Sequence, residues 1–479
     1  MKQRIQKLMA LDTQAKLLIW DLHGFSQKFD YKQLLIEEGF SIILYEDVEA
    51  VRYLYESELR NSQKKYAVIV QKDIYVPYDV KKEWKNVNLS LKHLYPRLNE
   101  FALERQSEHL ALIDMAYDGL YTNLSTYEQT ESFIMDTALS RANVQKYLSR
   151  ENQMLVLQAQ RARSHCDWID VAKRNAILSY YSIVYDIPRS TMELNRLFDV
   201  FIDKEYANLS GVVSSTFPAI LTKTLPTIAS EKTALIVIDG MSMSDYEVIK
   251  RTDWPFDSED YGAFALIPTT TSISRQSLLT GLYPSQMENQ FSLAKEESGF
   301  YQAAEKLGYS KMVAFFGRGY EVDLHHQVKL AAIILNDVDD IMHGQQQGDA
   351  GMGQDIRLMA QQGKLQKLIK RLLLQSFSVY ITSDHGHIYS NGNGITGRFG
   401  LEVEAKAQRV IVLKDFAEAS DAVKEASRLF PGTYLDKKYQ YYIAKDNLAF
   451  AAQDRKLITH GGVSLEEVVV PFIKVRGVK

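Results

Sequence analysis

This 479-residue sequence has almost no cysteine and no long apolar run. Its single cysteine, Cys166, cannot form an internal disulfide, which fits a reducing compartment. No stretch approaches the roughly 18 consecutive apolar residues that a membrane span requires. The opening "MKQRIQKLMALDTQAKLLIW" carries basic groups but no continuous apolar segment, so we expect no signal peptide. These absences predict a cytoplasmic protein without a membrane partner.

The sequence also lacks a large excess of charge of either sign. Its 56 basic and 60 acidic residues give a formal net charge of −4. This balance excludes wholesale electrostatic capture of nucleic acid and leaves room only for a local basic groove. With 46% hydrophobic and 24% charged residues, the composition is that of a soluble globular protein. The length predicts two or three domains at roughly 100–200 residues each.

Residues 1–95 predict a small doubly wound α/β domain, because short apolar runs alternate with helical stretches as in βαβ units. We expect strands at 16–21, 40–47 and 66–73 and helices at 31–39 and 48–60. Asp21 ends the first strand, where a receiver-type phosphorylation site would lie, but no adjacent acidic pair accompanies it. A structural or docking role for this domain is therefore favoured.

Glycine becomes scarce between residues 96 and 228, and the pattern turns helical. Apolar residues recur at spacings of three and four over 97–121 and 149–187, as amphipathic helices require. The aromatic residues of this segment are most simply core and helix–helix contacts. No chemistry is visible here, and the segment predicts a helical connector domain or a platform for a partner.

Residues 229–479 predict an α/β domain whose sheet carries helices on both faces. Most of its apolar runs are short and do not alternate with polar residues, as expected for strands that are covered on both sides. Strands are expected at 234–238, 263–267, 311–316, 331–335, 376–381, 408–413, 439–444 and 467–475. Helices are expected near 242–250, 272–280, 299–307 and 353–375, with 344–354 as a flexible loop.

Side chains with catalytic potential follow several of these strands. Sites in open α/β sheets form beyond the carboxyl ends of the strands. The candidate site residues at or after the ends of these strands are Asp239, Thr271, Asp339, His343, Asp384, His385 and His460. Taken singly, each has an ordinary explanation, since a strand-end aspartate commonly caps a helix and a loop histidine commonly hydrogen-bonds.

Together, three aspartates, three histidines and one hydroxyl at a single sheet edge indicate a metal site. Mixed carboxylate and imidazole ligands suit zinc or manganese, whereas an all-oxygen set would suit magnesium or calcium. Six ligands are too many for one tetrahedral ion with an open position and are enough for two. Two ions about 3.5–4 Å apart clamp the attacking and leaving oxygens of a phosphoryl displacement. The expected cofactors are two divalent transition metals, zinc first and manganese second.

The order Asp…Thr…Asp-x-x-x-His…Asp-His-Gly…His resembles the alkaline phosphatase superfamily. "IPTTTSISRQSLLTGLYPSQ" (267–286) is similar to the nucleophile segment of its phosphodiesterases, and "HGGVSLEEVVVPF" (460–472) to a closing histidine segment. "IDGMSMSDY", "PTTTSISRQSLLTG" and "NDVDDIMHG" most resemble the PglZ domain, known from BREX phage-defence systems and from response regulators. The likeness covers about 233–475, and residues 1–230 resemble the front half of some PglZ proteins much less specifically.

The resemblance implies a role for each matching residue. One metal would contact the Thr271 oxygen and be held by three further residues: Asp239, Asp384 and His385. The second metal would be held by Asp339, His343 and His460. Asp337 or Asp340 competes for the place of Asp339, but the Asp-x-x-x-His spacing favours Asp339.

The implied activity is that of a phosphodiesterase or nuclease-type hydrolase. Thr271 would attack a nucleotide or oligonucleotide phosphodiester, and other proteins of a BREX-like defence system would be partners. Phosphomonoester hydrolysis is an alternative that needs extra positive charge; Arg275 is a candidate for it, although a solvated helix residue is an equal interpretation. A scaffold whose chemistry is secondary or absent is the alternative from another class. His387 has no counterpart in the family pattern, which favours a structural role.

Overall fold

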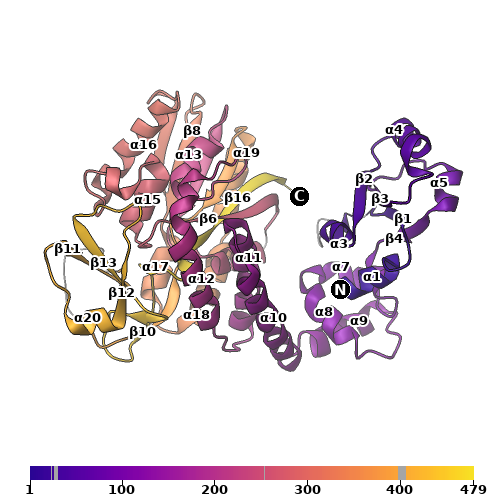
Figure 1. The fold of residues 1–479 in the computed structure, drawn as a ribbon, viewed down its shortest axis with the longest axis horizontal. Helices are drawn as coiled ribbons and strands as arrows, with labels where there is room; N and C mark the ends of the chain where they lie inside the picture. Colours follow the sequence, from indigo (N-terminus) through magenta and orange to yellow (C-terminus); the bar gives the residue numbers. More distant parts are fainter. Residues whose placement is uncertain (23, 26–30, 253, 397–405, 479) are drawn as a thin grey trace. The chain divides into compact units, whose positions relative to one another are not determined.

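The computed structural model describes the chain except residues 23, 26–30, 253, 397–405 and 479. Its contacts group into two compact units, Met1–Tyr147 and Leu148–Lys479, which are described in turn (Figure 1). This grouping divides residues 96–228 between the units, and the three predicted domain boundaries remain predictions. Among the described residues, no helix has both the length and the apolarity of a membrane span.

The first unit is built on a four-stranded parallel sheet with the order β2-β3-β1-β4. The strands are β1 (Lys16–Trp20), β2 (Phe40–Leu44), β3 (Lys65–Val70) and β4 (Lys85–Asn88). The helices are α1 (Lys2–Met9), α3 (Tyr31–Glu37), α4 (Val48–Leu54), α5 (Tyr78–Glu83), α6 (Leu91–Leu94), α7 (Glu100–Arg105), α8 (Leu110–Tyr117) and α9 (Tyr127–Phe133). The three strands expected in residues 1–95 are confirmed, and β4 was not predicted.

Alternation along the strands places a hydrophobic cluster on each face of this sheet. Leu17 and Ile19 of β1 belong to a cluster that also contains side chains of α1, α3 and α8. Leu18 belongs to the other cluster, with side chains of α4 and α5. Asp21, directly after β1, is fully buried and accepts a hydrogen bond from the Tyr31 hydroxyl (2.9 Å). Burial and this hydrogen bond indicate a structural role for the Asp21 carboxylate.

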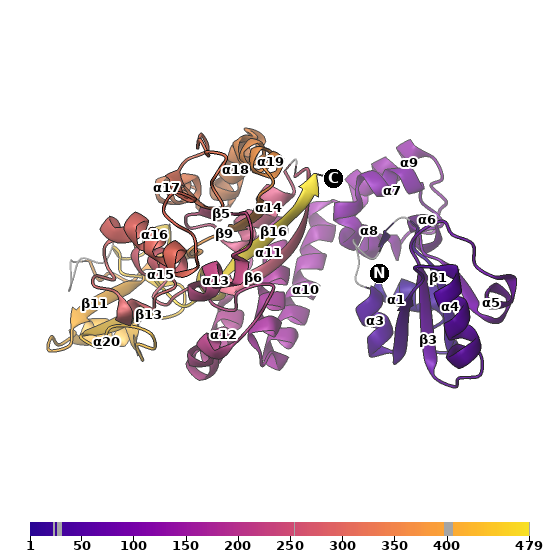
Figure 2. The same ribbon diagram turned by 90° about the horizontal axis from the view of Figure 1, so that it is seen from above.

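The second unit contains a six-stranded sheet with the order β6-β16-β9-β5-β8-β7 (Figures 1 and 2). The strands are β5 (Thr233–Ile238), β6 (Phe256–Phe264), β7 (Ala314–Arg318), β8 (Leu330–Leu335), β9 (Ser378–Thr382) and β16 (Val469–Val478). β16 runs antiparallel to both of its neighbours, whereas β9, β5, β8 and β7 are parallel. The carboxyl ends of β5, β6, β8 and β9 and the amino end of β16 therefore lie along one edge.

Helices cover both faces of this sheet. The helices of this unit are α10 (Arg141–Arg161), which spans the boundary between the units, α11 (His165–Val184), α12 (Met192–Glu205), α13 (Thr224–Ile228), α14 (Met243–Lys250), α15 (Thr271–Thr280), α16 (Glu296–Lys306), α17 (Asp337–Gly344), α18 (Gly348–Gln361), α19 (Lys364–Leu374), α20 (Asp421–Ala426), which packs on a separate sheet described below, and α21 (Leu465–Val468). Side chains of α14, α18 and α19 share one buried cluster with β5, β8 and β9. Phe198 of α12 packs on Phe264 of β6, with ring centroids 6.0 Å apart.

Two three-stranded sheets accompany the main sheet, with the orders β11-β13-β12 and β14-β10-β15. Their strands are β10 (Ile388–Gly392), β11 (Val410–Lys414), β12 (Ser427–Phe430), β13 (Tyr439–Ala444), β14 (Leu448–Ala449) and β15 (Lys456–Thr459). The strands expected at 408–413 and 439–444 exist as β11 and β13, but they pair antiparallel with each other outside the main sheet. The strand expected at 263–267 is wrong in its bounds, because β6 ends at Phe264.

Two helix predictions are also corrected by the structure. The loop expected at 344–354 contains the start of α18, which begins at Gly348. The single helix expected at 353–375 is broken into α18 and α19 at Gly363, whose φ of 68° is left-handed. Glycine reaches this conformation without the steric cost that other residues meet, so it ends one helix and starts the next.

Candidate metal centre

The residues singled out in the sequence come together at the edge where β5, β6, β8 and β9 end. Their places are Asp239 after β5, Thr271 at the start of α15, Asp339 and His343 on α17, Asp384 and His385 after β9, and His460 after β15. Six of them form two groups whose ligand atoms lie within 4.8 Å of one another: Asp239, Asp384 and His385 in the first, and Asp339, His343 and His460 in the second.

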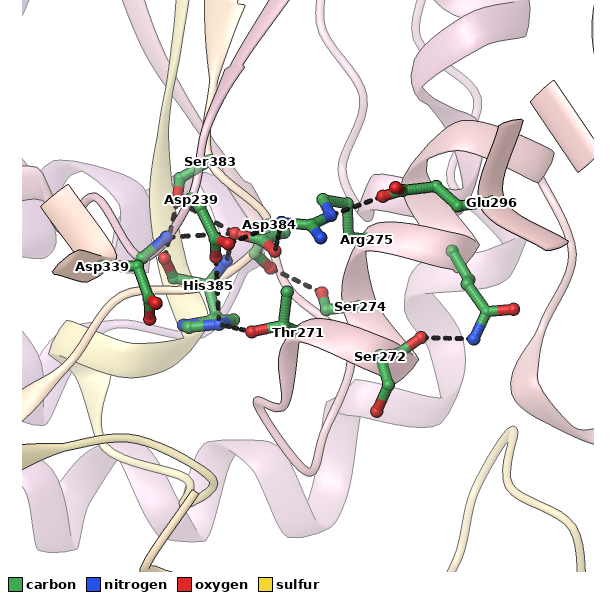
Figure 3. A network of polar contacts seen from close by, with 12 residues as sticks. Asp239, Thr271, Ser272, Ser274, Arg275, Glu296, Asp339, Ser383, Asp384 and His385 are labelled. Carbon is green, nitrogen blue, oxygen red and sulfur yellow. Dashed lines mark hydrogen bonds and ion pairs between the residues drawn. The ribbon is translucent and has the colours of Figure 1, made fainter. Parts of the chain in front are cut away.

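The first group surrounds the hydroxyl of Thr271 (Figure 3). His385 Nε2 lies 2.9 Å from Thr271 Oγ1 and 3.7 Å from Asp239 Oδ1. Asp384 Oδ1 accepts backbone N–H bonds from Gly240 (3.2 Å) and from His385 (3.1 Å). These bonds fix one oxygen of Asp384 and leave the other available to a ligand.

The second group is carried by α17 and the loop after β15. His343 Nε2 lies 3.0 Å from Asp339 Oδ1, in an orientation that makes no hydrogen bond. The ring of His460 stacks on that of His385, with centroids 4.1 Å apart, and its centroid lies 5.7 Å from that of His343. The contact between His385 and His460 joins the two groups into one site.

The two groups fit metal ions because most of their ligand atoms are buried and lack hydrogen bonds. The atoms concerned are Asp239 Oδ1, Asp339 Oδ1, His343 Nε2, Asp384 Oδ2 and His460 Nε2. Leaving a buried polar atom without a partner costs about 1–3 kcal/mol, a cost that a bound cation offsets. Carboxylate and imidazole donors together suit zinc or manganese better than magnesium or calcium.

Two histidines have their tautomers fixed by backbone carbonyl groups. His460 Nδ1 bonds to the carbonyl of Thr269 (2.8 Å), and His385 Nδ1 bonds to the carbonyl of Gly386 (3.0 Å). Because a carbonyl oxygen only accepts, each Nδ1 carries the proton and donates it. Nε2 then keeps its lone pair on the side of the site, as in histidines that bind metals.

Arg275, one turn after Thr271 on α15, is bound within the site. Only 3% of its side chain is exposed, because α15 packs against α16. Its guanidinium donates to Asp239 Oδ2 and to Glu296, and its Nη1 lies 3.9 Å from Asp384 Oδ2 (Figure 3). The interpretation of Arg275 as a solvated helix residue is therefore wrong, and its charge offsets part of the negative charge of the first group.

Burial and neighbouring charges shift the pKa values of the ligand residues. Burial and the adjacent Asp239 carboxylate raise the pKa of Asp384 to about 7. Burial and the adjacent His385 ring lower the pKa of His460 well below its ordinary value, which keeps this ring neutral. Burial opposes ionisation of Asp339, but the nearby His343 ring and Lys406 ammonium hold its pKa below the ordinary value.

His387 binds to a structural partner next to the two groups. Its Nε2 lies 2.7 Å from Asp245 Oδ2, and the same oxygen accepts the backbone N–H of Ser242 (2.8 Å) at the start of α14. Burial alone would lower the pKa of His387, but the Asp245 carboxylate raises it above its ordinary value. The pair ties the loop after β9 to α14, which supports the structural role expected for His387.

Glycine allows the loop after β9 to pass between two other segments. A Cβ on Gly386 would lie 2.0 Å from the carbonyl oxygen of Glu466 and 3.3 Å from Ser242 Cα. Both neighbours are backbone, so no side-chain movement could relieve the contact. Gly386 therefore lets the Asp384 and His385 loop approach the loops that carry Asp239 and His460.

The sequence interpretation missed three side chains that shape the site. Lys406 Nζ lies 2.8 Å from Asp339 Oδ2, Glu296 pairs with Arg275, and Asp245 pairs with His387. The four-residue spacing of Thr271 and Arg275 puts both on one face of α15, a signal that could have placed Arg275 in the site. Lys406 lies in a turn, where no periodicity of the sequence gave such a signal.

The architecture and the two aspartate–histidine groups define a class: an alkaline phosphatase-like phosphohydrolase fold. Residues 221–475 match the family described as the BREX system PglZ alkaline phosphatase-like domain. Because this match covers more than half of the chain, the chain belongs to the PglZ family, as the resemblance implied. A search of curated proteins returned no match.

Among solved structures, similarity to two kinds of enzyme is found. Murine ectonucleotide pyrophosphatase/phosphodiesterase 5 is 12% identical, with 51% of this chain and 88% of that chain covered and a TM-score of 0.34. The human protein of the same name is 13% identical, with 51% and 88% covered and a TM-score of 0.33. Phosphonoacetate hydrolase from Sinorhizobium meliloti 1021 is 12% identical, with 52% and 90% covered and a TM-score of 0.32. The family assignment depends on the domain match alone.

Proposed function

We propose that this PglZ protein is a two-metal phosphodiesterase that attacks nucleotidic phosphodiesters with Thr271. The observation that carries the proposal is the meeting of two buried aspartate–histidine groups beside one threonine hydroxyl. Zinc is the first choice of metal and manganese the second, from the donor set. The BREX assignment of the family makes other defence proteins the proposed partners.

The chain's own residues position the nucleophile and the substrate. Bound divalent cations would supply Lewis acidity, lowering the pKa of a coordinated hydroxyl or water and offsetting charge on the phosphoryl oxygens. Thr271 Oγ would lose its proton and bond to phosphorus as the bond to the leaving oxygen breaks, and the leaving oxygen would take up a proton. Water would then displace the threonine oxygen, giving one proton back to Thr271 Oγ and restoring the enzyme. Thr271 is the first residue of α15, so the positive end of this helix would stabilise negative charge on a phosphoryl group bound there.

The bonding of Arg275 favours a diester substrate over a monoester. A dianionic phosphoryl group calls for an additional cation that can contact its oxygens. Arg275 is the cation nearest to Thr271 along α15, but its Nε and Nη1 donate to Glu296 and Asp239, and these two carboxylates already offset its charge. A diester carries one negative charge fewer and does not need that contact.

Replacing Thr271 by alanine tests the proposal. We expect zinc- or manganese-loaded protein to cleave bis-p-nitrophenyl phosphate, and Thr271→Ala to lower turnover by about 10³-fold or more, because the nucleophile is lost. Both proteins should hold about two metal ions per chain by elemental analysis. Thr270→Ala, which removes a neighbouring buried hydroxyl that approaches Ser272 (3.5 Å), is the matched control and should stay within about threefold of the unaltered protein.

If the protein is a scaffold without chemistry, we expect neither bound metal nor diester cleavage. Purified protein that holds no metal, and that gains no diester cleavage when zinc or manganese is added, would refute the enzymatic proposal. Full activity in Thr271→Ala would refute the threonine mechanism while leaving hydrolysis itself in place.

A further inference from the structure

A hollow of about 400 Å³ lies directly beside the second group of candidate ligands. We call it the basic hollow; the lining residues that matter are His343, Gln346, Lys406, Gln408, Arg455 and Lys456. His343 is shared between the hollow and the second group. Lys406 is a second link, because its Nζ lies 2.8 Å from Asp339 Oδ2. The basic hollow is therefore continuous with the candidate metal centre.

The hollow is positive in a chain that is slightly negative overall. Lys406, Arg455 and Lys456 line it, and among the residues that the structure describes its lining includes no aspartate or glutamate. These positive side chains favour an anion as the occupant. Side-chain amides of Gln346 and Gln408 add hydrogen-bonding groups that can donate to an anionic oxygen.

A comparison within the same unit shows that this charge pattern is not general. Another hollow in the unit is also lined by arginine, but its cations are paired with carboxylates. Arg196 bonds to Asp446 (3.1 Å), and Arg428 pairs with Asp199. In the basic hollow Lys406 is likewise paired, with Asp339, but Arg455 and Lys456 form no ion pair with a carboxylate of the described residues and are available for a ligand.

The position of the hollow indicates which part of a substrate would occupy it. Thr271 lies with the first group, so the oxygen that leaves in an in-line displacement lies on the opposite side of phosphorus. The second group is the one that continues into the basic hollow. We propose, building on the proposed phosphodiesterase function, that the basic hollow binds a second phosphate group on the leaving fragment, so that the enzyme prefers diesters that carry another phosphate beyond the scissile one.

Equilibrium binding tests this proposal without relying on turnover. The probe is a 5′-fluorescein-labelled pentathymidylate, titrated with zinc-loaded Thr271→Ala protein at several salt concentrations and followed by anisotropy. Adding Arg455→Gln and Lys456→Gln should weaken binding about tenfold and flatten the plot of log Kd against log salt by roughly 0.7 for each phosphate that the protein no longer neutralises.

Two controls isolate the hollow. Lys424→Gln with Lys437→Gln removes the same charge from exposed positions that do not line it, and should change Kd by less than about twofold. A second pentathymidylate keeps its first phosphodiester linkage and has uncharged methylphosphonates in place of the others. It should bind to protein with the unaltered hollow as weakly as the fully charged probe binds to the Arg455→Gln and Lys456→Gln variant. Equal losses in both double variants, or no loss in either, would overturn the proposal.

The outcome for the hollow is separable from the outcome for catalysis. The unaltered protein, which keeps Thr271, could fail to cleave bis-p-nitrophenyl phosphate while its binding of the probe still depends on Arg455 and Lys456. That result would refute the proposed hydrolysis and support the phosphate site. If the unaltered protein cleaves and the double variant lowers kcat/KM equally for the small diester and for a dinucleotide carrying a terminal phosphate, hydrolysis stands and the phosphate site fails. A loss at least fivefold larger for the phosphorylated dinucleotide supports both.

Discussion

At the residue scale, the site stores negative charge that a cation would neutralise. Asp239 and Asp384 are buried side by side, and the single guanidinium of Arg275 is shared with Glu296. Asp384 responds by holding its proton more tightly, with a pKa of about 7. The protonation state of Asp384 and metal binding are therefore coupled, because a ligating carboxylate must lose its proton.

Proton release on metal binding should follow this pKa. At pH 6, Asp384 is mostly protonated in metal-free protein, so zinc binding should release about one proton from it; at pH 8 the release should be about a tenth of a proton. Calorimetric titrations in two buffers with different ionisation enthalpies give the number directly. Equal release at pH 6 and pH 8 would contradict the coupling.

The same raised pKa sets the sign of a stability effect. Because the folded pKa of Asp384 lies above its unfolded value of 3.8, its contribution stabilises metal-free protein below that value and is lost as pH rises through about 7. Zinc removes this loss by replacing the proton. The increase in Tm caused by zinc should therefore be larger at pH 7.5 than at pH 5.5.

At the scale of elements, loops that meet at one sheet edge determine the site. The loop after β9 can approach its neighbours only because Gly386 has no Cβ. Elsewhere on the same edge, Gly240, with φ 74°, turns the chain after Asp239, and a Cβ on it would lie 3.7 Å from Asp339 Cα. The ligand geometry thus depends on backbone contacts between loops as well as on the ligands themselves.

Gly386→Ala should damage the fold and the site together. The new Cβ would lie 2.0 Å from a backbone oxygen, so we expect a loss of about 3 kcal/mol or more in the free energy of unfolding, together with reduced metal content. Urea unfolding and elemental analysis measure the two effects. Gly344→Ala, at the end of α17, meets nothing within 4 Å and is the control, with an expected change under about 0.5 kcal/mol. Equal stability of both variants would contradict this interpretation.

The same scale shows what the sequence could and could not predict. The central strands β5, β8 and β9 are uninterrupted apolar runs, and the runs located them to within a few residues. Partners of β11 and β13 were not predictable, because pairing depends on which surfaces meet after folding. The ion pair of Arg275 with Glu296 was not predictable for a similar reason, because nothing in the spacing of residues 275 and 296 indicates that α15 packs against α16.

The candidate ligands were recognisable because the capacity to bind a metal follows from residue type, whereas the pairing of strands does not. Aspartate and histidine at strand ends are few, and parallel strands bring those ends to one edge. Grouping of the six ligands into two sets came only from the family resemblance, and the geometry brings the same sets together. Their binding of metal stays a prediction until metal is measured.

At the scale of the whole molecule, the candidate site belongs to one of two compact units. Every candidate ligand and the core cluster beneath the main sheet lie within Leu148–Lys479. A unit with its own core is expected to fold alone. Residues 1–147 then serve a purpose other than forming the site.

A chain that begins at Arg141, the first residue of α10, should therefore remain competent. We expect it to hold about two metal ions and to cleave bis-p-nitrophenyl phosphate within about threefold of the full chain. Size-exclusion chromatography, elemental analysis and the cleavage assay measure these properties, with the same shortened chain carrying Thr271→Ala as the background control. Aggregation of the shortened protein, under conditions that keep the full chain soluble, would contradict the expectation.

The position of β16 has a consequence for synthesis of the protein on the ribosome. This strand comes after His460 in the chain, yet it lies between β6 and β9 in the sheet. A nascent polypeptide that ends before β16 can already contain every candidate ligand, but it lacks the strand that joins β6, on the Thr271 side of the sheet, to β9. The main sheet is therefore incomplete until β16 has been synthesised, and the loops that carry the candidate ligands are held along one edge only after this strand has inserted between β6 and β9.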